Sequence, residues 1–219
     1  MAQFEKANSV GEWLDQRLNV KTFNKVMMTE YWIPKDINFL WAMGVLLATT
    51  FGILIISGLF LMMYYKPDIN LAFDSVNYTI MQEVAFGWLF RHIHGVAASV
   101  IFLIIYIHML TGIYYGSYKQ GREMIWISGM LLFVTFSAAG FSGYMLPWGQ
   151  MSYWAAMVIT NLFGGVPVIG DALVVWIRGD FNVADATLTR FFMLHVFLLP
   201  IAIMGLRSEE RRVGKECRL

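Results

Sequence analysis

Four long hydrophobic runs dominate the chain, and shorter, more polar stretches separate them. Each run matches or exceeds the roughly 20 residues that an α-helix needs to cross the hydrocarbon core of a bilayer. The pattern therefore predicts an all-α membrane protein built on a four-helix transmembrane bundle. The expected spans are Phe39–Tyr65, Val84–Tyr115, Met124–Leu146 and Ala186–Leu206.

Two segments outside these spans have patterns of their own. Between Val10 and Leu18, apolar residues recur at helical spacing among charged ones, which is typical of a short amphipathic helix on the membrane surface. The segment Gly149–Trp176 is apolar but interrupted by glycine and proline. It is therefore expected to form a short helical hairpin in one membrane face, lining a cavity, rather than a fifth span.

Composition agrees with a chain whose solvent is mostly lipid. Hydrophobic residues make up 58% of the chain and charged residues 14%, and the mean hydropathy is +0.58, values typical of an integral membrane protein. The single cysteine, Cys217, excludes internal disulfides and a cysteine-ligated iron–sulfur cluster. The polar first 30 residues show no signal-peptide pattern. The formal charge of +1 gives no reason to expect a nucleic-acid partner.

Basic residues outside the spans indicate the orientation of the chain. They gather before the first span and between the second and third, whereas the first loop has one lysine against three acidic residues. Because cytoplasmic loops carry an excess of Lys and Arg, we expect a cytoplasmic N-terminus in a bacterial inner membrane. His94 and His195 then lie toward the outer face, and His108 lies toward the inner face.

Two histidines, His94 and His108, are 14 residues apart with no charged residue between them. Fourteen residues of α-helix rise about 21 Å and return to within roughly 40° of the starting face. Any one such histidine is as readily a packing residue as a ligand. His195 matches the depth of His94, however, so the three together are predicted metal ligands. His92 points about 160° away from His94 and is expected to be a non-ligand.

Glycine repeats the same interval on two other spans. Gly44 and Gly58 are 14 residues apart on the first span, and Gly129 and Gly143 on the third. Helix packing is the usual role of such glycines, but a flat macrocycle also needs helix faces without side chains at each depth. Histidines on one span and glycines on two others thus repeat at the same 14-residue interval. This pattern predicts two haem groups, each with two imidazole ligands, a coordination that favours electron transfer.

Five strings spread over most of the chain carry a family resemblance. They are Arg91-His92-Ile93-His94-Gly95 with His108 following, Tyr114-Tyr115-Gly116-Ser117-Tyr118, Gly149-Gln150-Met151-Ser152 with Trp154, Val158-Ile159-Thr160-Asn161-Leu162, and Thr189-Arg190-Phe191-Phe192 before His195. In these strings the chain resembles the N-terminal half of cytochrome b, the quinol-oxidising subunit of cytochrome bc complexes.

The resemblance implies a low-potential b haem near the outer face. His94 and His195 would be its two axial ligands. Arg91 lies where an arginine commonly meets a haem propionate, and Gly58 and Gly143 lie where the family packs glycine against this haem.

The resemblance also implies a high-potential b haem near the inner face. His108 would be one ligand, with Gly44 and Gly129 packed against the haem. The family's fourth ligand is expected about 14 residues beyond His195, where this chain has Glu209, a poor substitute for imidazole.

The last 13 residues differ from the rest of the chain. Eight of them are charged, and each charge near the bilayer centre costs roughly 2.5–3.5 kcal/mol. A cytoplasmic tail is one explanation, because a span ending at Leu206 is just long enough. The tail also resembles a translated sequencing adapter. We therefore expect a haem-binding domain at residues 1–206 and an appended foreign tail at residues 207–219.

The resemblance places a quinol-oxidation pocket at the hairpin. Quinol would be oxidised at the outer face, with one electron passing to a Rieske iron–sulfur protein and a c-type cytochrome, and the other crossing through both haems to a quinone. The C-terminal half of cytochrome b would complete the pocket in a homodimeric complex. The expected pocket residues are Gly149, Met151, Trp154, Ala155, Ile159 and Leu162, with Ala155 where many relatives have glycine.

Two other classes of protein stay open from the residues alone. The dihaem membrane cytochrome of a hydrogenase or formate dehydrogenase would also have spaced histidines, but it would not need the hairpin. A histidine-bearing transporter would need no cofactor. A covalently attached haem is not expected, because Asn38–Gly44 contains no cysteine.

Overall fold

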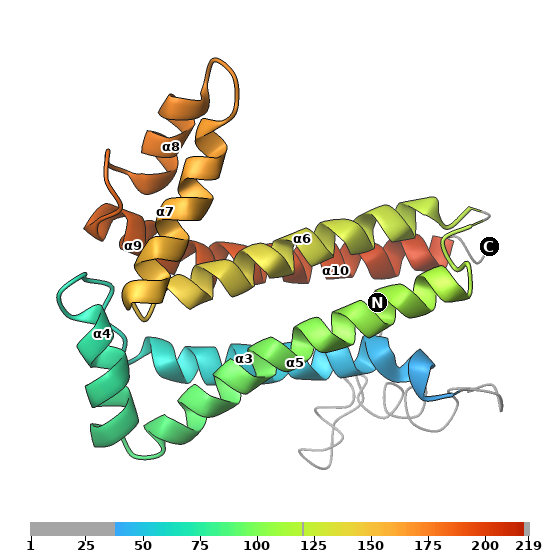
Figure 1. Cartoon of the computed structure of the whole chain (residues 1–219). Coiled ribbons are helices and arrows are strands. Elements are labelled where there is room, and N and C mark those ends of the chain that lie inside the picture. The colour runs from blue at the N-terminus through green and yellow to red at the C-terminus, as the bar shows by residue number, and fades with distance from the viewer. Residues whose placement is uncertain (1–37, 120, 217–219) are drawn as a thin grey trace, which may run out of the picture. The chain divides into compact units, whose positions relative to one another are not determined.

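The computed structural model describes residues 38–119 and 121–216, with side chains as far as residue 208 (Figure 1). The chain divides into two units, one ending at Trp41 and the other beginning at Ala42. In the first unit only residues 38–41 are described, where the 3-10 helix η2 (Phe39–Ala42) begins and the Leu40 amide donates a hydrogen bond to the Asn38 side chain. The predicted surface helix lies outside the described residues.

Four helical spans of the described chain are long and apolar enough to cross a membrane, which confirms the main prediction from the hydrophobic pattern. The first three contain α3 (Met43–Met62), α5 (Gly87–Tyr114) and α6 (Glu123–Met145). The last span is a continuous helix built from three elements: α9 (Asp185–Met193), the π-helical η4 (Leu194–Leu198) and α10 (Leu199–Glu216). The four spans end within a few residues of the predicted ones, but the helix of the last span continues beyond the predicted Leu206 to Glu216.

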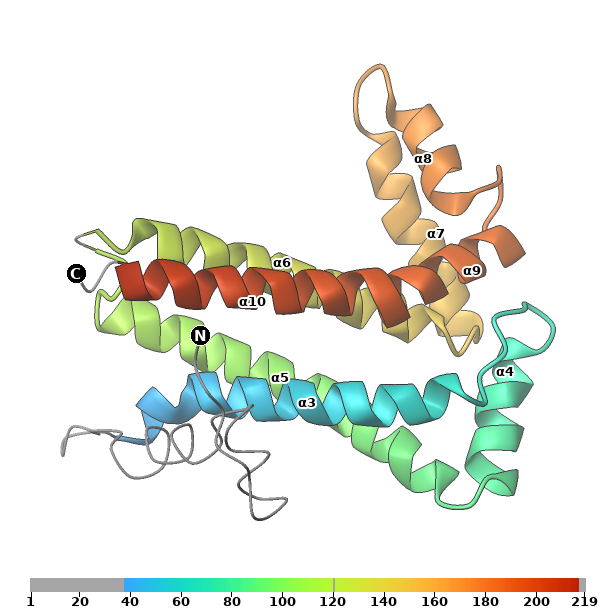
Figure 2. The same cartoon turned by 180° about the vertical axis from the view of Figure 1, so that it is seen from behind.

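The spans pack as two helix pairs, which we call the α3–α5 pair and the α6–α10 pair (Figures 1 and 2). Contacts between the pairs are made by large side chains. Phe102 of α5 packs against Gly140 of α6, and Trp126 of α6 packs against Gly112 of α5. Each ring fits where the opposite helix has no side chain, so glycine sets the closest approach of the pairs.

Shorter helices connect the spans at the end that carries His94 and His195. The predicted hairpin is present as α7 (Gln150–Gly164) and α8 (Gly170–Arg178). The loop between the first two spans contains α4 (Ala72–Asp74) and the π-helical η3 (Ser75–Glu83), which the sequence pattern did not predict.

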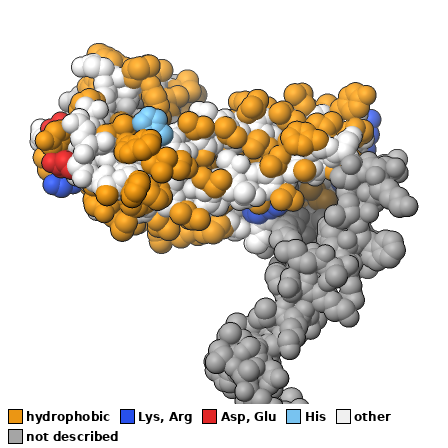
Figure 3. Space-filling view, turned by 90° about the horizontal axis from the view of Figure 1, so that it is seen from below, with side chains coloured by type: hydrophobic (Ala, Val, Ile, Leu, Met, Phe, Trp, Pro, Cys, Tyr) orange, Lys and Arg blue, Asp and Glu red, His pale blue; other side chains and the backbone are white. Residues whose placement is uncertain are grey.

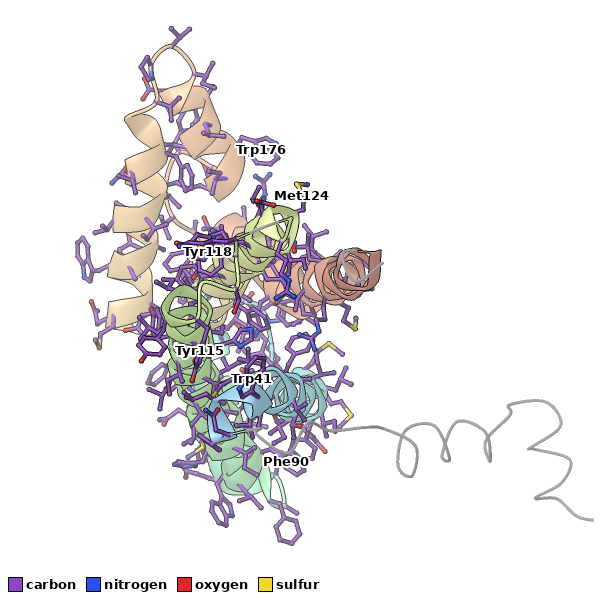
Figure 4. The ribbon with its side chains drawn as sticks, turned by 90° about the vertical axis from the view of Figure 1, so that its right-hand side faces the viewer. Trp41, Phe90, Tyr115, Tyr118, Met124 and Trp176 are labelled. Carbon is purple, nitrogen blue, oxygen red and sulfur yellow. The ribbon has the colours of Figure 1, made fainter. Side chains whose placement is uncertain are left out.

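Hydrophobic side chains cover most of the surface of the spans, and charged ones lie mainly towards their ends (Figure 3). Val45 is 70% exposed and Leu110 is 64% exposed. Seen along the spans from the end that carries Tyr115 and Tyr118, the side chains radiate outward from the helices (Figure 4). A helix that is apolar on its outer face suits a lipid surrounding, as the composition predicted.

Candidate functional site

His94 and His195 face each other across the two helix pairs. Their ring centroids are 6.2 Å apart and their planes meet at 76°. His94 projects from α5, and His195 projects from η4. A metal ion about 2 Å from one nitrogen of each ring would fit between them. The rest of the 6.2 Å separation is the distance from each bonded nitrogen to the centre of its own ring.

The imidazole of His94 is held by α3, its partner in the pair. Its Nδ1 atom lies 2.9 Å from the Ser57 hydroxyl oxygen, and Ser57 gives its own hydrogen to the Ile53 carbonyl at 2.6 Å. Nδ1 must therefore carry the hydrogen and donate it to Ser57. This tautomer leaves the Nε2 lone pair of His94 free for a metal, the usual arrangement of a ligating histidine.

The imidazole of His195 is held in the same way by α6. Its Nδ1 atom donates to the Ala139 carbonyl at 2.9 Å, and the Ser142 hydroxyl lies 3.4 Å from the same nitrogen. A carbonyl can only accept, so Nε2 of His195 is again the free nitrogen. Each pair thus orients one ligand with its own backbone and hydroxyl groups.

Glycine makes room for both rings. A Cβ atom on Gly58 would lie 3.2 Å from Cε1 of His94, and one on Gly143 would lie 2.5 Å from Cε1 of His195. The predicted glycines therefore lie beside the predicted ligands, and any larger residue would displace the imidazoles. The donor set and its glycine cradle fit a group that takes two imidazoles at the iron.

His195 lies in a π-helical turn that the sequence analysis missed. The Leu199 amide bonds the Leu194 carbonyl, five residues back, and π-turns within α-helices are frequent at functional sites. Pro200 follows, and its missing N–H leaves the Val196 carbonyl without the usual α-helical donor. Pro200 was the signal in the sequence that could have indicated this turn.

The inner level, by which we mean the depth of His108, Gly44 and Gly129, is described only in part. A Cβ atom on Gly44 would contact Cε1 of His108 at 4.0 Å, so the α3–α5 pair repeats the arrangement of Gly58 and His94 one level lower. Gly129 of α6 faces open space, with nothing within 4 Å of its Cβ position. The side chain of Glu209 lies outside the described residues.

His92 and Arg91 are close to His94 in the chain, but they are not part of the outer level, by which we mean the depth of the facing pair of His94 and His195. His92 is exposed, and its Nδ1 donates to the Trp88 carbonyl at 2.7 Å. Arg91 borders a hollow of about 360 Å³ between η3 and α5, with Asn77 and His92 as its other polar lining residues. His92 is thus bonded to its own helix, whereas His94 contacts Ser57 of α3.

A second cavity, of about 390 Å³, lies at the start of α7. Of the residues expected at the quinol pocket, Gly149 and Trp154 line this cavity, and its other lining residues are Trp148, Gln150 and Tyr153. The cavity follows the first turn of α7, where the Trp154 indole donates to the Gln150 side chain at 3.3 Å.

Four predicted pocket residues do not line this cavity. Met151 is 74% exposed and Leu162 is 72% exposed, and neither lines the cavity. Ala155 and Ile159 are half-buried farther along the helix. The cavity is confined to the start of α7, and the spacing of residues along the helix could not predict where the cavity ends.

A buried arginine joins the hairpin to the last span. Arg178 is 6% exposed and donates to the Thr160 hydroxyl at 2.8 Å, the Asn161 side chain at 2.8 Å and the Phe181 carbonyl at 3.2 Å. The Thr187 hydroxyl in turn donates to the Arg178 carbonyl at 2.9 Å. Thr187 belongs to the same continuous helix as His195, so the cavity helix and the ligand helix are fixed to each other at this point.

Comparisons with known proteins agree with this geometry. The family model described as Cytochrome b/b6/petB matches residues 28–208. Cytochrome b of Allochromatium vinosum is 48% identical over 194 residues, which is 89% of this chain and 46% of the relative. Cytochrome b of Rickettsia conorii is 48% identical over 202 residues, which is 92% of this chain and 50% of the relative. The chain thus spans about half the length of these curated relatives.

A solved structure shows a similar fold. One chain of a hyperthermophilic respiratory complex III matches with a TM-score of 0.85 and 39% identity, over 95% of this chain and 55% of that chain. The similarity includes the hairpin, which the alternative dihaem cytochromes would not need. The comparisons therefore favour the resemblance that the five strings carry.

Proposed function

This chain belongs to the cytochrome b family, and from that premise we propose that it forms the haem-binding N-terminal half of the cytochrome b subunit of a quinol-oxidising cytochrome bc complex. The single observation that carries this proposal is the facing pair of His94 and His195. Each has its Nδ1 held by a neighbouring helix and its Nε2 free.

The residues of the outer level would hold a low-potential haem b. His94 and His195 would be its axial ligands, Gly58 and Gly143 would leave room for the rings, and Arg91 would meet a propionate. Haem b supplies reversible one-electron chemistry when it is bound. The chain's own contribution is to fix the two imidazoles in the tautomer and orientation that ligation requires.

The residues of the inner level would hold half of a high-potential haem site. His108 would be one ligand, with Gly44 and Gly129 beside the cofactor. We propose that the fourth ligand belongs to the natural continuation of the last span, and that residues 207–219 are an appended tail, because their composition differs so sharply from that of the span before them.

We propose that the cavity at the start of α7 is one wall of the quinol-oxidation pocket. Gly149 and Trp154 would contact the quinol directly, together with Trp148, Gln150 and Tyr153. The remaining expected pocket residues would meet it only in the intact protein, where the C-terminal half covers the outward face of α7: Met151, Ala155, Ile159 and Leu162.

The complex would include further subunits in the same membrane. We propose a Rieske iron–sulfur protein and a c-type cytochrome as redox partners, and a homodimeric assembly. The surplus of lysine and arginine before the first span and between α5 and α6 supports a cytoplasmic N-terminus in a bacterial inner membrane.

A visible spectrum of the full-length protein and two variants tests the proposal. We expect a reduced α-band of low-spin haem b. His195→Ala should abolish the outer-haem band, whereas His92→Ala should keep it, because His92 is exposed and bonded to its own helix. Absence of the band after haem-replete expression, or loss of haem in His92→Ala with retention in His195→Ala, would contradict the proposal.

A further inference from the structure

Three phenylalanines lie halfway between the outer and inner levels, one on each of three helices. Phe51 on α3 lies seven residues from both Gly44 and Gly58. Phe136 on α6 lies seven residues from both Gly129 and Gly143. Phe102 on α5 is one residue from the midpoint between His94 and His108. Seven residues of α-helix rise about 10 Å, so the three rings lie at one depth, separate from both levels.

The rings cross the interface between the two helix pairs. Phe51 and Phe136 meet edge to face, with centroids 5.5 Å apart and planes at 83°. The ring of Phe102 packs against Gly140, where a Cβ atom would be 3.0 Å from it. Ile101, next to Phe102, is 1% exposed. All three phenylalanines are half-buried, so apolar side chains occupy the contact between the pairs at this depth.

Polar groups at the same depth are engaged within their own helices. In residues 47–55, 98–105 and 132–140 no side chain is charged, and every hydroxyl donates to the carbonyl four residues back at 2.8–3.4 Å. Water enters a protein interior only where polar partners can bind it. The hydroxyl residues are Thr49, Thr50, Ser99, Thr135 and Ser137.

We propose that Phe51, Phe102 and Phe136 form a dry aromatic partition that keeps water and protons from passing along the bundle between the two haem levels. This inference rests on the proposed function, since charge separation across the membrane is retained only if protons cannot return through the same protein. Close packing by large apolar rings fills the space that water would need.

Passive proton leak in liposomes tests the partition. The full-length protein in its complex is reconstituted into vesicles that contain a pH-sensitive dye, and proton entry is driven by a potassium gradient with valinomycin. F51S/F136S removes two rings and adds two hydroxyls, so its leak should be several-fold faster than that of the wild type. F51L/F136L refills the space with apolar atoms, so it should restore the wild-type rate.

Phe60→Ser is the matched control. Phe60 is also on α3 and stacks on Phe90 at 3.9 Å, but it lies beyond the outer level. Its leak should equal that of the wild type. The inference is overturned if F51S/F136S remains as tight as the wild type with its α-band intact, or if Phe60→Ser leaks equally.

A folding defect in the double variant can be recognised by loss of its α-band. In that case F136S alone gives the answer: an intermediate leak supports the partition, and a wild-type leak overturns it. Failure of the proposed function is a separate result, because it would appear as a missing α-band in the wild type.

Discussion

Gly143 lies so close to His195 that a Cβ atom on the glycine would be 2.5 Å from Cε1 of the imidazole. The ring cannot move away without losing its 2.9 Å bond to the Ala139 carbonyl. Gly143→Ala is therefore expected to abolish haem binding at the outer level while leaving the helices intact. Haem per protein, from the reduced α-band, and helix content, from circular dichroism, measure the two effects.

Gly52→Ala is the control for this variant. Gly52 is also in a span, but a Cβ atom there would contact nothing within 4 Å. We expect an unchanged haem content and a slightly higher melting temperature, because alanine is favoured over glycine within a helix by about 1 kcal/mol. Equal haem loss in both variants would refute the steric explanation.

Ser57→Ala removes the acceptor that orients His94. The hydroxyl lies 2.9 Å from Nδ1 and is 2% exposed. Loss of such an outer partner typically weakens metal binding by about 10–100-fold, and we expect a weakening near the lower end of this range for haem, measured by titration into the haem-free protein. Thr50→Ala removes a hydroxyl from the same helix that bonds only the Leu46 carbonyl, and it should leave the affinity unchanged.

Arg178→Met should loosen α7 from α8 and from the loop that leads to the last span. The change leaves the acceptors of Thr160, Asn161 and Phe181 without their donor, and buried groups left unsatisfied cost about 1–3 kcal/mol. Hydrogen exchange should accelerate in α7, α8 and the start of α9, but not in α3. Arg178→Lys should give a smaller effect, because one ammonium cannot reproduce the guanidinium fork. Unchanged exchange in Arg178→Met would contradict the role of this contact.

We expect the stability of the folded protein to depend on pH in the alkaline range because of Tyr65. Its hydroxyl donates to the Leu146 carbonyl at 2.7 Å, and burial raises the pKa of Tyr65 above the ordinary value of 10.0. The unfolded chain would ionise this tyrosine near pH 10 while the folded chain keeps it neutral. The contribution of Tyr65 is therefore full below pH 10 and falls as the pH rises above it.

Tyr65→Phe isolates that contribution from other tyrosines. Below pH 10 the variant should be less stable than the wild type by about 1 kcal/mol, the usual net value of one hydrogen bond. The difference in melting temperature should shrink as the pH rises from 10 to about 11.5, since the wild type alone loses the contribution. A constant difference across this range would show that Tyr65 does not carry the effect.

Hydrophobic run length was enough to predict the four spans, because crossing a bilayer imposes a length that can be counted along the chain. The hairpin followed from the glycine and proline residues that interrupt its apolar segment. The depth of His94 and His195 followed from the same count. Their hydrogen-bond partners, Ser57 and Ala139, could not be predicted, since they depend on which helix packs against which.

Other misses have local physical causes. The π-turns at η3 and η4 arise from backbone pairing that leaves no period in the hydropathy. Which residues line the cavity at the start of α7 depends on the tertiary packing around that helix, so Gly149 and Trp154 line it whereas Met151 and Leu162 do not.

Each proposed ligand of the outer haem is oriented entirely within its own helix pair, His94 by Ser57 and His195 by Ala139. This division has a consequence for biogenesis. The α3–α5 pair leaves the ribosome first and can fold one finished half of the site before the second half has been translated. Haem bound between the pairs would then join two halves whose histidines are already oriented, and it would add to the contacts of Phe102 and Trp126 that already hold the pairs together.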